Sequence, residues 1–63
     1  MELPELKVSP AEEFEIIKQA AEKENITAML KLSEFYEKGI GTTVNQELAN
    51  YWHNKAEVVL HQK

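Results

Sequence analysis

The 63-residue chain contains no cysteine, no arginine and no aspartate. The lack of cysteine excludes a disulfide framework and a cysteine-ligated zinc site, and it makes the reducing cytoplasm the default compartment. Glutamates outnumber lysines by eleven to seven, and the net charge of −4 argues against a nucleic-acid binder, which would carry a basic stripe. We therefore expect a cytoplasmic protein that does not bind nucleic acid.

Long hydrophobic runs are also missing. Residues 1–8 are acidic where a signal peptide is basic, and they lack its apolar region. No stretch approaches the roughly 20 apolar residues of a membrane span, so we expect no contact with membranes. The short chain is near the lower limit for a self-supporting core, which predicts an extended segment over 1–8 and a single domain over 9–63.

Residues suited to catalysis are few. Ser9 is placed to cap a helix and Ser33 to pack between helices, so neither is free to act as a nucleophile. No serine, histidine and acid have the spacing of a triad, and the paired carboxylates lie on polar helix faces. A ligand pocket is hard to fit into so small a core. We predict no enzymatic activity, no catalytic residue and no cofactor.

The first of three predicted helices covers residues 10–24. Ser9 is placed to cap it, Pro10 to occupy its first position, and Glu12 to complete a capping box with Ser9. Apolar residues recur at helical spacing and form one stripe, which comprises Phe14, Ile17 and Ala21.

A second helix is predicted over residues 26–38, followed by Gly39, which has free access to positive φ. Ser33 is the smallest residue on its inward side and would permit a close helix approach. In the following loop, Ile40 and Val44 are expected to fold onto the core. The inward face is predicted to comprise Ala28, Leu32, Phe35 and Tyr36.

The third helix is predicted over residues 46–61, with Asn45 as its capping residue. Trp52 lies at helical spacing from Ala49 and Ala56, and these small neighbours leave room for its ring, so we expect the ring in the core. The broad inward face is predicted to comprise Leu48, Ala49, Trp52, Ala56, Val59 and Leu60.

The first and third helices repeat each other at a spacing of 36 residues. With this shift Ile16 falls on Trp52 and Ala20 falls on Ala56, and each helix follows a capping residue. A repeat of this period is typical of solenoids, which act through binding surfaces and not through reaction centres.

The sequence also resembles a known repeat family. Residues 25–61 are similar to one full Sel1-like repeat, which is related to the tetratricopeptide (TPR) repeat, and residues 9–24 are similar to the second half of a preceding repeat. Ser33 and Glu24 depart from the pattern, since both stand in place of a glycine. The resemblance implies an all-α, three-helix fragment of an αα-superhelix that serves as an adaptor or scaffold without enzymatic activity. The residues that carry it are Ala28, Leu32, Tyr36, Gly39, Gly41, Asn45, Ala49, Trp52, Lys55 and Ala56.

Polar residues replace apolar ones on one side of the third helix. Asn50, His53 and Glu57 correspond to the apolar stripe of the first helix, and we expect them to form a solvated end face. Ile16, which stands where the third helix has Trp52, is the exception and needs a cover. We expect that cover from the N-terminal segment, through Leu3, Leu6 and Val8.

Exposed apolar and acidic residues are the candidate partner contacts. Leu30 is expected opposite the inward face of the second helix, near Glu34 and Glu37. Tyr51 and Val58, seven residues apart on the third helix, form a second apolar patch that suggests a partner protein or a homodimer through this helix.

We therefore predict a small, non-enzymatic protein–protein interaction module, such as an adaptor, an inhibitor or an immunity-like binder, whose partner is another protein. The alternative is a structural piece that caps a longer repeat array. A third hypothesis is a metal-binding helix face at His53, Glu57 and His61. Because the outer two of these lie about 12 Å apart along one straight helix, we predict no metal site.

Overall fold

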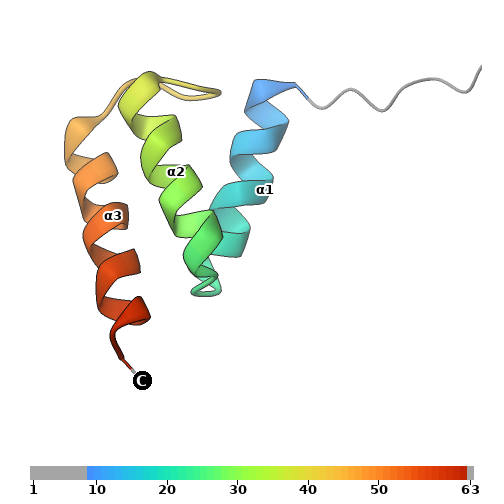
Figure 1. Ribbon diagram of the computed structural model, residues 1–63. Helices are drawn as coiled ribbons and strands as arrows, with labels where there is room; N and C mark the ends of the chain where they lie inside the picture. Colours follow the sequence, from blue (N-terminus) through green and yellow to red (C-terminus); the bar gives the residue numbers. More distant parts are fainter. Residues whose placement is uncertain (1–8, 63) are drawn as a thin grey trace, which may run out of the picture.

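A computed structural model describes residues 9–62, and within this range the chain forms three α-helices and no strand (Figure 1). The helices are α1 (Pro10–Glu22), α2 (Ile26–Lys38) and α3 (Gln46–Leu60). The all-α class is thereby confirmed. The proposed cover of Ile16 belongs to residues 1–8, which lie outside the described residues.

Helices α1 and α3 begin at the capping residues that the sequence predicts. The Ser9 hydroxyl accepts a hydrogen bond from the backbone N–H of Glu12, and the Glu12 carboxylate accepts one from the N–H of Ser9, which completes the capping box. The Asn45 side chain accepts from the N–H of Leu48. Ser9 and Asn45 are 36 residues apart, which is the shift at which the sequences of the two helices were compared.

The ends of α1 and α2 are set by left-handed residues. α1 stops at Glu22, two residues earlier than predicted, because the backbone of Glu24 turns with φ of 64°. Glycine is the residue that adopts this conformation without steric cost. α2 ends before Gly39, whose φ is 71°, as the sequence predicts. α3 ends at Leu60, one residue early.

Helix α2 lies between α1 and α3, runs antiparallel to each and packs against both (Figure 1). No Cα atom of α1 comes within 8 Å of a Cα atom of α3. A helix with neighbours on two sides buries a wider face than a single apolar stripe, and for this reason Met29, which the sequence prediction omits, is fully buried. The buried residues of α2 are Ala28, Met29, Leu32, Ser33, Phe35 and Tyr36.

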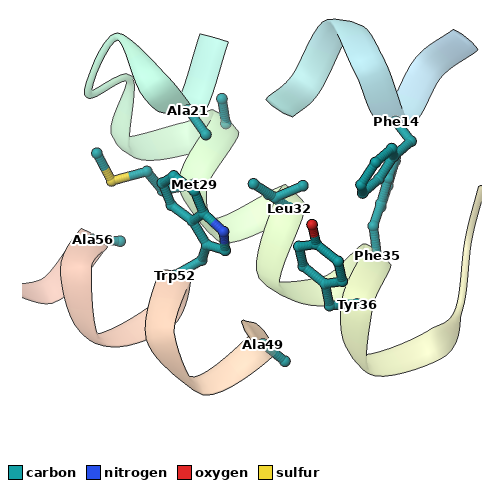
Figure 2. Packing of buried hydrophobic residues seen from close by; sticks show 10 residues of the cluster. Phe14, Ala21, Met29, Leu32, Phe35, Tyr36, Ala49, Trp52 and Ala56 are labelled. Atoms are coloured by element: carbon teal, nitrogen blue, oxygen red, sulfur yellow. The ribbon is translucent and has the colours of Figure 1, made fainter. Parts of the chain in front are cut away.

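The core has an aromatic group at one end and the Trp52 ring at the other (Figure 2). Phe14 of α1 meets Tyr36 of α2 edge to face, with ring centroids 5.4 Å apart. Fully buried Leu32 lies between this pair and Trp52 in the view of Figure 2. The prediction that Trp52 belongs to the core is confirmed, since its side chain is buried in the cluster.

Helices α2 and α3 are joined by a hydrogen bond at a small residue. The Ser33 hydroxyl donates a buried hydrogen bond of 2.7 Å to the backbone carbonyl of Ala49. Both side chains are small and buried, so the two backbones can come together here. The serine thus satisfies its own hydroxyl while it occupies little space.

Substitution of Ser33 tests this close approach. Ser33→Ala removes only the hydrogen bond, and we expect it to lower the free energy of unfolding by about 1 kcal/mol. Ser33→Leu also forces bulk between the helices, and we expect a loss of about 2–3 kcal/mol. Urea denaturation followed by circular dichroism gives both values. Equal, small effects would show that the helices are not in close contact at this point.

Three apolar side chains of the predicted core are exposed, so these predictions were wrong. Because Ser33 lies opposite Ala49 in an antiparallel pair, Leu60 extends about one turn beyond the first residue of α2 and has no helix beside it. The Leu48 side chain points about 100° away from that of Ala49 around the helix, so it lies at the edge of the contact between α2 and α3. The exposed residues are Val44, Leu48 and Leu60.

The α2–α3 loop packs onto the start of α1. Ile40 is partly buried against the core as predicted, whereas Val44 points to solvent. Gly41 has φ of 70°, and a Cβ atom on it would lie only 2.1 Å from the carbonyl oxygen of Pro10. The backbones therefore meet where only glycine fits. This contact fixes the loop against α1.

Candidate protein-binding surfaces

The predicted contact residues of α2 share the side that faces away from the core. Leu30, Glu34 and Glu37 each follow a buried residue of α2 by two positions. Two residues turn a helix by about 200°, which places all three opposite the buried face. We call Leu30, Glu34 and Glu37 the α2 surface. All three are exposed, as the sequence predicts.

The charges on this surface are partly paired. The Lys38 ammonium lies 2.9 Å from a carboxylate oxygen of Glu34, one turn apart on the exposed side of α2. The hydrogen bond and the charge of Lys38 hold the pKa of Glu34 below its ordinary value, and the same contact raises the pKa of Lys38. Both groups are solvated, so the pair adds little to stability. Glu37 has no such partner among the described residues, and the exposed Lys31 also helps to lower the pKa of Glu34, so charges of both signs surround Leu30.

A second apolar surface follows α3. Tyr51 and Val58 lie two residues after the buried Ala49 and Ala56, and so point away from α2. Leu48, which the sequence prediction assigns to the core, extends this line. We call Leu48, Tyr51, Lys55 and Val58 the α3 stripe.

The aromatic part of the stripe is ordered by its neighbours. The Tyr51 ring stands edge to face against Trp52 at 5.2 Å between centroids, and one edge of the stripe is thereby fixed to the core. The Lys55 ammonium lies 5.8 Å from the Tyr51 ring centroid and 5.4 Å from that of Trp52, within range of a cation–π contact. The only charge on the stripe is therefore held over aromatic rings.

The structure groups the five predicted contact residues into two separate surfaces. The acids and Leu30 lie on the open side of α2, and Tyr51 and Val58 lie on the side of α3 that faces away from α2. The sequence alone does not reveal this separation, because the direction of each helix face depends on its neighbour. The two surfaces must therefore be tested independently.

The end face of α3 is polar. Asn50, His53 and Glu57 are exposed, and a ring nitrogen of His61 lies 3.5 Å from a Glu57 carboxylate oxygen. Within residues 9–62 no three histidines or acids come together as a metal-ligand group. The hypothesis of a metal-binding face thus lacks a third ligand on the described part of the chain.

Residues 9–62 form no pocket, and none of the three helices is long and apolar enough to cross a membrane. No protein-family model, curated protein or solved structure matches the chain. The Sel1-like resemblance therefore rests on the sequence pattern, and the function has to be argued from the surfaces.

Proposed function

We propose that this protein is a small protein-interaction module of the Sel1-like αα-repeat type, without enzymatic activity and located in the cytoplasm. The observation that carries the proposal is that α2 packs against both α1 and α3. The two helices that the 36-residue shift brings into register contact α2 from opposite sides, as successive helices of a solenoid do. Solenoids use such stacks to present binding surfaces.

The equivalent positions of α1 and α3 show that the two helices use different faces. Phe14 and Ala21 of α1 are buried, whereas Asn50 and Glu57, which correspond to them in α3, are exposed. Conversely, Trp52 of α3 is buried, whereas its counterpart Ile16 is exposed. Each helix thus buries the face that meets α2 and leaves the other open, which is the arrangement expected for consecutive units of one array.

The α2 surface is the proposed contact with a partner protein. In an αα-superhelix the first helix of each repeat lines the concave side, and α2 holds this position in the Sel1-like alignment. Leu30 supplies an apolar anchor, and the exposed Glu34 and Glu37 flank it. A partner that fits would offer an apolar side chain flanked by charges of both signs, to complement the glutamates as well as the exposed Lys31 and Lys38.

Capture of a partner by variants of the full chain tests the proposal. In a lysate of the source organism we expect the tagged protein to retain one partner in fixed stoichiometry, and Leu30→Glu to reduce the retained amount at least about tenfold because the apolar anchor becomes charged. Ile16→Glu is the matched control, since it makes the same change at an exposed apolar site on α1. Equal retention by both variants would exclude the α2 surface.

The polar end face supports a second candidate, a cap of a longer repeat array. Asn50, His53 and Glu57 are exposed at the positions through which α1 contacts α2, so a further helix finds no apolar surface there. A cap would retain only proteins that contain further repeats of the same kind. The composition of the captured material therefore separates the two candidates.

A further inference from the structure

Exposed apolar side chains gather along one line of the molecule. Seven large apolar residues are exposed in the described part of the chain, and five of them lie on α3 or in the loop just before it. On α3 itself, Leu48, Tyr51, Lys55 and Val58 follow one another at intervals of three, four and three residues. Alternating intervals of three and four residues place side chains on one side of a helix, as in helices that pair along a seam. The exposed apolar residues of this line are Leu48, Tyr51 and Val58.

The charge of the stripe favours a second copy of this chain as its partner. The protein carries eleven glutamates and a net charge of −4, so two copies repel each other over most of their surfaces. No carboxylate lies on the stripe, and its only charge is the Lys55 ammonium, held near the Tyr51 ring. A cation with an aromatic ring beside it on the same seam is a self-complementary pair.

Only one orientation of two copies uses this pair. In an antiparallel pairing centred on residue 53, Leu48 meets Val58 of the second copy, and Tyr51 meets Lys55 of the second copy. Each ammonium then gains the Tyr51 ring of the second copy in addition to the Tyr51 and Trp52 rings of its own chain. A parallel pairing would place the two Lys55 ammonium groups opposite each other, which is repulsive.

We propose that the α3 stripe joins two copies of this protein in an antiparallel homodimer. The inference deepens the proposed function, because it names the partner of one of the two surfaces. A single helix pair buries less than a standard interface, so we expect a dissociation constant on the order of 10–100 µM. The α2 surface stays open in this dimer and is presented twice.

Sedimentation velocity between about 5 µM and 1 mM tests the dimer, a range that brackets the expected constant. The parent chain is expected to shift from monomer to dimer as its concentration rises. The Val58→Glu variant is expected to remain monomeric over the whole range, with an association at least tenfold weaker than that of the parent. Leu60→Glu is a closely matched control. Leu60 is 54% exposed and Val58 is 57% exposed, but the two lie about 200° apart around α3. Circular dichroism verifies that both variants are folded.

The absence of native cysteine allows the orientation to be tested with single-cysteine variants. Asn54 and Glu47 are both exposed on α3, on the same flank of the stripe. In the antiparallel pairing the two Asn54 positions lie within about 3 Å of each other along the helix axis, whereas the two Glu47 positions are about 18 Å apart. Under mild oxidation Asn54→Cys is expected to form a covalent dimer, and Glu47→Cys is not.

Several outcomes would overturn the proposal. These are a parent chain that remains a folded monomer at 1 mM, equal effects of Val58→Glu and Leu60→Glu, or equal cross-linking of the two cysteine variants. A monomer whose stripe binds a different protein would also overturn it. None of these results affects the capture experiment with Leu30→Glu, so the failure of the dimer and the failure of the proposed function are distinguishable.

Discussion

Replacement of Trp52 with alanine is expected to leave the protein largely unfolded at room temperature. The side chain is only 9% exposed, and Ala49 and Ala56 beside it are too small to fill the space that it would vacate. Truncation of a buried tryptophan costs about 3–5 kcal/mol. A domain of this size has only about 3–9 kcal/mol of stability in total.

Tyr51→Ala is the matched control for this substitution. Tyr51 is the adjacent aromatic residue on the same helix and touches the Trp52 ring, but it is 51% exposed. We expect it to lower the free energy of unfolding by about 1 kcal/mol or less. Urea denaturation by circular dichroism, at concentrations below the dimer range, measures both variants. A Trp52→Ala variant with near-parental stability would contradict the placement of the ring in the core.

Replacement of Gly41 with alanine is expected to have the next largest effect, a loss of about 2–5 kcal/mol from positive φ and steric overlap together. The added Cβ atom would lie 2.1 Å from the Pro10 carbonyl oxygen and 2.7 Å from the Pro10 carbonyl carbon. These are backbone atoms of the first turn of α1, and they cannot move aside without detaching the loop. Thermal and urea denaturation measure the loss.

Gly39→Ala separates the two contributions. Gly39 has nearly the same φ as Gly41, but the nearest obstacle to its Cβ atom is a methyl group of Val44, 2.8 Å away. Val44 is exposed and its side chain can rotate, so only the cost of the left-handed conformation, about 1–2 kcal/mol, is expected. If the two variants are equally stable, the loop does not rest on α1.

Local signals predicted the starts of the helices well. Ser9, Pro10 and Glu12 contact one another within four residues of sequence, so their capping box needs no tertiary information. The end of α1 was predicted too late, because a glutamate at Glu24 gives no sign of a left-handed turn. Where Gly39 occupies such a position, the end of α2 was predicted correctly.

Burial at the edges of helix faces was harder to predict. Met29 and Leu48 both border apolar stripes, yet Met29 is fully buried and Leu48 is exposed. The difference depends on how far the neighbouring helix covers the edge of the apolar face. The pattern of residues within a single helix does not predict this coverage. The contact between Gly41 and Pro10 is similarly hidden, because 31 residues separate the two positions.

The candidate surfaces were partly visible in the sequence. Leu30, Tyr51 and Val58 each lie on the far side of their helix from its strongest apolar positions, so their exposure follows from helical periodicity. The periodicity does not show that α2 and α3 turn these residues toward different sides of the molecule. The extension of the α3 stripe to Leu48 could not be predicted for the same reason. Whether Leu48 is exposed depends on how far α2 covers the side of α3.

The most direct test of the shared position of α2 is a nuclear Overhauser experiment on the isotope-labelled full chain. We expect cross-peaks between the rings of Phe14 and Tyr36, whose centroids lie 5.4 Å apart, and between Ser33 and Ala49, which share a 2.7 Å hydrogen bond. Cross-peaks that link α2 to Ile16 or Glu57 in place of these pairs would contradict the arrangement.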